Sequence, residues 1–390
     1  MSGAVANETG AGPDPGPARP RRRLRWADLG VLPLVATLPF MYYPKLLDGD
    51  TQPWVLLAGL LALFTFRTAR FATPRDLSPI LLAIACAGVY ALRSDGGLDV
   101  VRAVYTQAAF IVFWLVCRRE NNEFFPSAVR LTIIVWLAVG LYQYFALALG
   151  WPVEIAGRYV EGRSGVPSLT SEPSTYGSLS MLQMMYLLTR DERRNVPYIA
   201  AAAVSVVLSG SVLALILLIF PLLKFKARLR LAALVALPVL ALADFLFTSA
   251  GLTSRLQTIG ADGAGIAALL LDPSLNLRVG HLVFTLGANF FDSVLLLSPL
   301  GFMDQYNAFA QDSGVFIETG SDFILPALGE LIYGSGVFGL LLLVRVLYLA
   351  QTRSTGAAAR FEKIFFTLMC MMNPISLSNF FLILYLNRRN

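Results

Sequence analysis

Long apolar runs separated by short charged breaks recur along this chain of 390 residues and restrict it to few folds. The first runs span 27–44, 53–66, 77–92, 100–117 and 128–149, and others follow near 173–189, 231–247 and 328–350. Several are shorter than the ~20 residues of an untilted membrane helix. Because 56% of the residues are hydrophobic and only 14% are charged, unlike a soluble domain, the pattern predicts an all-α polytopic membrane protein.

The charge of each break predicts the side of the membrane that it faces. The breaks 67–75 (RTARFATPR) and 117–130 (CRRENNEFFPSAVR) are basic, and basic loops stay in the cytoplasm. The breaks 43–50 (YPKLLDGD) and 93–99 (RSDGGLD) are more acidic or balanced. We therefore expect these two breaks on the outer side.

The same alternation predicts two periplasmic loops, at about 150–172 and at about 248–327. The middle of the longer loop, 277–297, is apolar but is interrupted by polar residues. Such a segment suits a helix that lies in the membrane interface or re-enters a cavity. It is not expected to span the bilayer.

Two apolar runs are long enough to be one helix or two. The run 196–223 is followed by the basic break 224–230, so two short helices hinged at Ser209-Gly210-Ser211 keep that break in the cytoplasm. By the same argument, the run 364–386 divides at Asn373-Pro374, because the tail after it is basic. The chain is then expected to have about twelve spans, with both ends in the cytoplasm.

The domain organisation follows from these spans. Residues 1–25 are rich in Gly, Pro, Ala and Arg and carry no apolar face, which predicts a disordered, basic cytoplasmic tail. Residues 26–390 are expected to form a single transmembrane domain.

The sequence lacks the residues that several kinds of function need. The net charge of +6 lies in short clusters between apolar runs, so no nucleic-acid surface is indicated. The three cysteines are widely spaced and His281 is the only histidine, so neither a disulfide framework nor a metal site is expected. Walker, HExxH, CxxC and nucleophile-elbow motifs are absent from the sequence. We expect no cofactor.

The loop segment 157–176 (GRYVEGRSGVPSLTSEPSTY) concentrates charge among turn residues between two apolar runs. Arg158 and Arg163 carry guanidinium groups, whose planar forks bind phosphate, so the pair suits a lipid-linked pyrophosphate. Ordinary surface arginines remain the alternative. Glu172 precedes a Pro at the start of the next span, where it could cap the helix. It could equally accept a proton from an attacking sugar hydroxyl.

Further candidates lie elsewhere in the chain. Arg278 and His281 are three residues apart, so they share one face of a helix in the longer periplasmic loop. His281 could serve as a base or could simply pack against apolar neighbours. Arg102 lies just inside an apolar run, where it could face a cavity or pair with Asp99.

These motifs, taken in order, resemble the bacterial O-antigen polymerase and O-antigen ligase superfamily. They are GRYVEGRSG and TSEPSTYG outside, the Ser-Gly-Ser hinge, LRVGHLVF and SPLGFM in the long loop, and then GVFGLLLL. The resemblance runs from about Trp26 to the C-terminus. It implies a metal-independent glycosyltransferase that acts on undecaprenyl-pyrophosphate-linked glycan at the periplasmic face of the inner membrane.

The resemblance also implies roles for residues. Arg158, Arg163 and Arg278 would hold the pyrophosphate or the glycan, while Glu172 or His281 would deprotonate the acceptor hydroxyl. Family members often carry an Arg within the hinge, where this chain has Ser-Gly-Ser. Arg102 is a candidate to supply that contact instead.

Three functions remain as hypotheses. The first is a polymerase of lipid-linked repeat units, for O-antigen, capsule or exopolysaccharide. The second is a ligase that transfers finished glycan to lipid A core or to protein. The third is a transporter or flippase of lipid-linked sugar, which would need its charges near the bilayer midplane. Expected partners are undecaprenyl-pyrophosphate-linked oligosaccharide and membrane lipids, with a chain-length regulator and a flippase as further candidates.

Overall fold

The computed structural model describes the larger part of the chain, and its regular elements there are all helices. The described residues are 52–65, 74–93, 98–119, 124–153, 165–188, 192–224, 270, 272–296, 301–320, 324–349 and 356–372. Within them no strand occurs, which confirms the all-α prediction. The predicted tail at 1–25 and the predicted spans at 27–44 and 231–247 lie outside the described residues.

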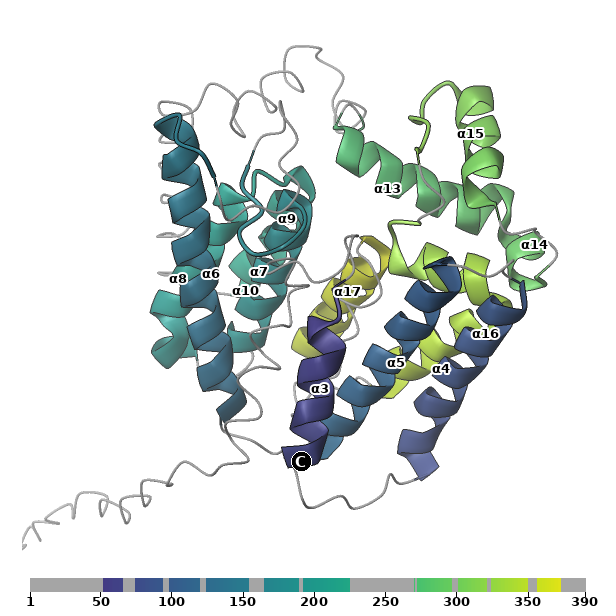
Figure 1. The fold of residues 1–390 in the computed structure, drawn as a ribbon, viewed down its shortest axis with the longest axis horizontal. Coiled ribbons are helices and arrows are strands. Elements are labelled where there is room, and N and C mark those ends of the chain that lie inside the picture. Colours follow the sequence, from purple (N-terminus) through teal and green to yellow (C-terminus); the bar gives the residue numbers. More distant parts are fainter. Residues whose placement is uncertain are drawn as a thin grey trace, which may run out of the picture.

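One group of helices brings the first described part of the chain against a late segment. It consists of α3 (Trp54–Thr65), α4 (Pro74–Arg93), α5 (Leu98–Arg119) and α16 (Ala327–Leu349). In this group α4 packs between α5 and α16, and α3 packs on α5 (Figure 1). These helices coincide within a few residues with four predicted apolar runs, because a helix satisfies the backbone hydrogen bonds of an apolar segment internally.

The second group is built around α7. Its members are α6 (Phe124–Ala148), α7 (Pro173–Leu188), α8 (Glu192–Leu208), α9 (Val212–Leu217) and α10 (Ile219–Lys224). All residues of α7 from Tyr176 onward are buried, because α6, α8, α9 and α10 all pack on this helix. Glu172, one of the candidate residues, lies directly before the first residue of this central helix.

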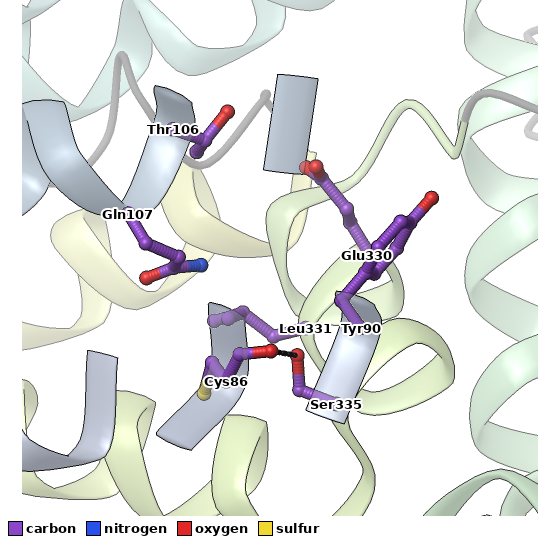
Figure 2. Close-up of a pocket in the computed structure, with 7 residues that line it drawn as sticks. All are labelled: Cys86, Tyr90, Thr106, Gln107, Glu330, Leu331 and Ser335. Atoms are coloured by element: carbon purple, nitrogen blue, oxygen red, sulfur yellow. Dashed lines mark hydrogen bonds between the residues drawn. The ribbon is translucent and has the colours of Figure 1, made fainter. Parts of the chain in front are cut away.

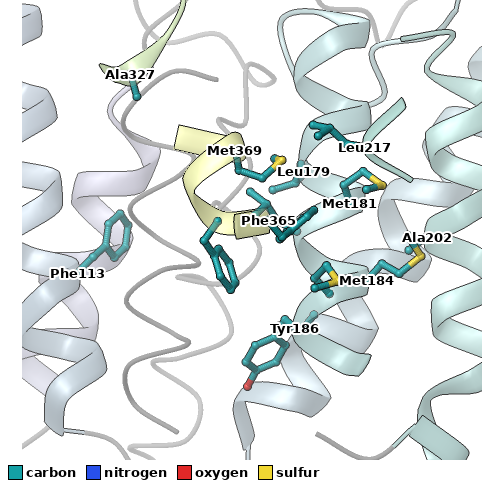
Figure 3. Close-up of a cluster of buried hydrophobic side chains, with 14 of the residues drawn as sticks. Phe113, Leu179, Met181, Met184, Tyr186, Ala202, Leu217, Ala327, Phe365 and Met369 are labelled. Atoms are coloured by element: carbon teal, nitrogen blue, oxygen red, sulfur yellow. The ribbon is translucent and has the colours of Figure 1, made fainter. Parts of the chain in front are cut away.

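The helix α17 (Gly356–Met372) joins the two groups. It packs on α16, and its Phe365 ring lies 5.8 Å from the ring of Phe220 in α10. Phe365 and Met369 belong to the same buried cluster as Leu179 of α7 (Figure 3). One hydrophobic core therefore extends through both groups.

The predicted hinge between α8 and α9 is confirmed. The helix α8 ends at Leu208, Gly210 has a left-handed φ of +58°, and the Ser211 side chain accepts a hydrogen bond from the Ala214 amide to cap α9. A small residue that tolerates positive φ and a hydroxyl cap are the features that let a helix restart at once. The other predicted division, at Asn373-Pro374, lies outside the described residues, where α17 has just ended.

Two described helices are long and apolar enough to cross a membrane, namely Phe125–Ala148 within α6 and Ala327–Leu349. Shorter apolar helices accompany them at 54–64, 77–93, 104–115, 195–208 and 212–221. Large apolar side chains point outward from the long helices, among them Phe145, which is 57% exposed, and Val344, which is 55% exposed. The total of about twelve spans stays a prediction.

The helix α16 is interrupted, which the apolar run at 328–350 did not predict. Gly336 has φ +59° and ψ −137° inside the helix, and Arg93 donates through Nη1 to the carbonyls of Tyr333 (2.7 Å) and Gly334 (3.3 Å). A kink frees helical carbonyls, and these need other donors in an apolar bundle. Beside the kink lies a cavity of about 20 Å³, room for about one water. Figure 2 shows its lining residues: Cys86, Tyr90, Thr106, Gln107, Glu330, Leu331 and Ser335.

The segment predicted as one interfacial or re-entrant helix at 277–297 forms three short helices. They are α13 (Pro273–Val283), a π-helix η2 (Phe284–Ala288) and α14 (Phe290–Val294), and α15 (Phe302–Ser313) follows. We refer to these four helices together as the α13–α15 arm. Asp272 starts the arm by accepting a hydrogen bond from the Leu275 amide at 2.9 Å. The arm packs on α16 and α17 at one end of the bundle (Figure 1).

Candidate functional site

The loop before α7 is held in place by close backbone contacts. Gly165 has φ +91°, and a side chain there would collide with the carbonyl of Ser209 in the hinge. The Val166 amide donates to the Leu208 carbonyl at 2.9 Å. Only glycine meets both demands, because it has no Cβ and tolerates positive φ. The hinge thus positions the loop as well as dividing two helices.

A side-chain clamp from α6 holds the middle of this loop. Gln143 donates through Nε2 to the Ser168 carbonyl at 2.8 Å, and its Oε1 accepts from the Ser168 amide at 2.7 Å. Ser168 has φ +52°, an uncommon conformation for a residue other than glycine, and it is fully buried. Its hydroxyl donates to the Trp136 carbonyl at 2.7 Å. Glu172 follows four residues later, directly before the start of α7.

Glu172 and Arg278 meet through Ser174. The Ser174 hydroxyl donates to Glu172 Oε2 at 3.3 Å, and Arg278 Nη2 donates to Ser174 Oγ at 3.1 Å. The two bonded partners Ser174 and Arg278 are 104 positions apart in the sequence. Glu172 is half-buried, whereas Arg278 is only 2% exposed. A carboxylate from the residue before α7 and a guanidinium from α13 therefore share one site.

Arg278 is also tied to the end of α17. Its Nη1 donates to the carbonyl of Met372, the last described residue of that helix. Its Nε is buried and has no hydrogen-bond partner. Burial lowers the pKa of Arg278, while Glu172 and Asp272 act in the opposite direction. The guanidinium keeps its charge, so it retains a buried donor for which an anion would be the natural partner.

His281 lies in an aromatic cluster and not beside Glu172. Its ring lies edge-on to Phe302 (4.8 Å between centroids) and Tyr306 (4.5 Å), and its Nδ1 accepts from the Leu325 amide at 3.3 Å. Burial, with a smaller effect of Arg278, lowers the pKa of His281 to about 3. The neutral ring then carries its proton on Nε2, which is buried without a partner. With its lone pair engaged by the Leu325 amide, the His281 ring offers no free basic nitrogen.

The other candidate residues cannot be placed in this site. Arg158 and Arg163 lie outside the described residues. Arg102 belongs to α5, but its side chain is outside the described part of the structure. The structure therefore brings Glu172 and Arg278 together, and it places His281 one turn along α13 with a different set of neighbours.

Sequence reasoning missed three members of the site. Ser174 stands in the Glu-Pro-Ser triplet but was given no role of its own. Gln143 carried a signal, since a lone amide inside an apolar run needs polar partners. The Met372 carbonyl carried none, because every residue has a backbone carbonyl and only tertiary packing selects this one.

The site can bind an anion and accept a proton. Within the described residues no group of three or more His, Cys, Asp or Glu side chains could hold a metal ion. The buried guanidinium offers charge and a free N–H, and the carboxylate beside it can take a proton from a hydroxyl. No family model matches the chain, and neither the curated proteins nor the solved structures include a match.

Proposed function

We propose that this protein is a polymerase of lipid-linked oligosaccharide repeat units. The observation that carries the proposal is the meeting of Glu172 and buried Arg278 on either side of Ser174. A carboxylate beside a desolvated cation suits a reaction in which a hydroxyl loses a proton while a phosphate group leaves as an anion. Transfer of a glycan from a lipid pyrophosphate is such a reaction.

The chemistry balances with these two residues and two substrates. The hydroxyl oxygen of one repeat attacks the anomeric carbon of another chain, and its proton passes to Glu172. The bond between that carbon and the pyrophosphate oxygen breaks, and the electron pair leaves with the undecaprenyl pyrophosphate. Arg278 stabilises the negative charge that develops on this oxygen. The proton on Glu172 then passes to solvent.

The proposed location is the periplasmic face of the bacterial inner membrane, in a multi-pass protein. The two membrane-length helices and the outward apolar side chains of α6 and α16 support a membrane setting. The basic breaks predicted to face the cytoplasm favour a position on the opposite side for the loop before α7 and for the α13–α15 arm. Arg158 and Arg163 are proposed to extend the pyrophosphate site, and a likeness to the O-antigen polymerase and ligase superfamily is part of this proposal.

A ligase would use the same site with a different acceptor, lipid A core or protein. A transporter of lipid-linked sugar could instead use the kink in α16, because interrupted helices line translocation paths. Two carbonyls at that kink already accept from Arg93, however, and the cavity beside it has a volume of about 20 Å³, room for about one water. The described residues around the kink thus offer little room for a sugar.

Deletion of the gene, followed by separation of surface and lipid-linked glycans by length, tests the proposal. We expect single repeats in place of long chains, restored by the wild-type gene. Glu172→Gln and Arg278→Lys should fail to restore long chains at unchanged protein amounts, because an amide takes no proton and a point charge does not replace a planar fork. The exposed Glu318→Gln and Arg360→Lys are matched controls. They should restore full length.

Other outcomes contradict the proposal in distinguishable ways. Intact long chains that stay on the lipid carrier would indicate a ligase. An unchanged glycan profile in the deletion strain would exclude both enzymes. Full restoration by Glu172→Gln and by Arg278→Lys would show that this site does not perform the reaction.

A further inference from the structure

The Ser174 hydroxyl forms its hydrogen bonds with two charged side chains. It accepts from Arg278 Nη2 at 3.1 Å and donates to Glu172 Oε2 at 3.3 Å. Serines in helices usually bond to nearby backbone instead, as Ser180 does on the same helix by donating to the Tyr176 carbonyl at 3.0 Å. The hydroxyl of Ser174 therefore links side chains of two segments instead of bonding to the backbone of its own helix.

The donor and the acceptor in each of these two hydrogen bonds follow from the number of hydrogens that each group carries. A hydroxyl has one hydrogen and a guanidinium has only donors. Because Arg278 must donate to Ser174 Oγ, the single hydrogen of Ser174 is free to point at Glu172. Bonds in such a chain polarise one another, so the charge of Arg278 strengthens the bond to the carboxylate. Within the described residues, no other donor contacts the Glu172 side chain.

Ser174 also keeps the two charges apart. Glu172 and Arg278 form no direct ion pair in the described structure, although the charge of Glu172 acts on Arg278 and partly offsets the lowering of its pKa by burial. A direct pair would engage both groups with each other, so that the carboxylate would be a weaker base and the guanidinium less available to phosphate. A hydroxyl between them holds their separation without neutralising either.

We propose that Ser174 is a positioning residue that aims Glu172 at the acceptor hydroxyl and holds it apart from Arg278, an inference that rests on the proposed polymerase function. The hydroxyl fixes Glu172 Oε2, which leaves the other carboxylate oxygen to receive the proton. Misaiming a base by about 1 Å can cost a hundredfold in rate. Ser174 thus acts on the chemical step through Glu172.

The test uses lipid-linked single repeats extracted from the deletion strain as substrate and the purified full chain in detergent. Ser174→Ala should lower kcat by about tenfold and change KM by less than about twofold, because the substrate is bound but the base is misaimed. Ser174→Thr keeps the hydroxyl and should recover kcat to within about threefold of wild type. Ser180→Ala, which loses only a bond within the helix, is the matched control and should leave both constants unchanged.

Each remaining outcome overturns one claim. An unchanged kcat in Ser174→Ala, an equal loss in Ser174→Thr, or a rise in KM alone would end the positioning role of Ser174. If Glu172→Gln retains the wild-type kcat in the same assay, or if the deletion strain holds no single repeats, the proposed function itself fails. Should Ser174→Ala not fold, Ser174→Thr and Ser174→Gly are compared, and equal kcat values in this pair contradict the proposal.

Discussion

Replacing Gln143 by Leu removes the clamp on the loop that carries Glu172. The substitution leaves the Ser168 amide and the Ser168 carbonyl without the partners that now bond them at 2.7 and 2.8 Å. Both residues have an exposed fraction of 0%, so water cannot replace the lost bonds. Leu has nearly the volume of Gln, so the change deletes hydrogen bonds without opening a large cavity.

The expected cost follows from the two orphaned groups. Each buried polar group left unsatisfied costs about 1–3 kcal/mol, so the pair costs about 2–6 kcal/mol of unfolding free energy. Ser168, held at φ +52°, is then free to relax to a common conformation. Because the loop runs directly into Glu172, the assembly of long glycan chains should fall even for the fraction of the protein that remains folded.

Thermal unfolding of the purified protein in detergent and glycan length in the complemented deletion strain measure the two effects. The matched control is Gln311→Leu, which removes an exposed amide that bonds Glu318 at 2.9 Å. That change should cost less than about 0.5 kcal/mol. Equal stability of Gln143→Leu and Gln311→Leu, together with full-length glycan from both, would refute the clamp.

Three further predictions concern other parts of the molecule. Between pH 7 and pH 5 the wild type should lose about 2 kcal/mol more unfolding free energy than His281→Gln. The reason is that the pKa of His281 is lowered from 6.5 to about 3 in the folded protein, so that only the unfolded chain takes up the proton in this range. Parallel pH profiles of Tm for the two proteins would contradict this. Gly165→Ala should destabilise the protein by about 2 kcal/mol or more through the clash with Ser209 and its positive φ, and a Tm equal to wild type would show that the loop lies elsewhere. In a chain without native cysteines, Asp312→Cys should react with an impermeant thiol reagent on intact spheroplasts and Arg360→Cys should not, whereas the reverse pattern would invert the topology.

The helices were largely predictable because hydropathy and charge act locally. Apolar runs at 53–66 and 77–92 became α3 and α4 nearly to the residue. The hinge at Ser209-Gly210-Ser211 was predictable from the charge of the break after it. The kink at Gly336 was not, because nothing in GVFGLLLL changes hydropathy or charge there and the break depends on donors such as Arg93 from α4.

The candidate site was predictable only in its parts. A charged residue in an apolar setting stands out in a sequence, so Glu172 and Arg278 could be selected. Their meeting depends on how α13 packs on α17 and reaches Ser174 at the start of α7, and no local signal encodes that packing. His281 shows the same limit, since its spacing from Arg278 predicted a shared helix face while the aromatic rings of α15 determine its surroundings.

The amount of undecaprenyl pyrophosphate released for each glycosidic bond formed measures the proposed polymerase reaction itself. The purified protein is incubated with lipid-linked single repeats from the deletion strain, and the free lipid and the glycan chains are quantified together. We expect one lipid pyrophosphate released for each bond, and neither product from Glu172→Gln. Chain growth without release of the lipid, or equal turnover by Glu172→Gln, would contradict this expectation.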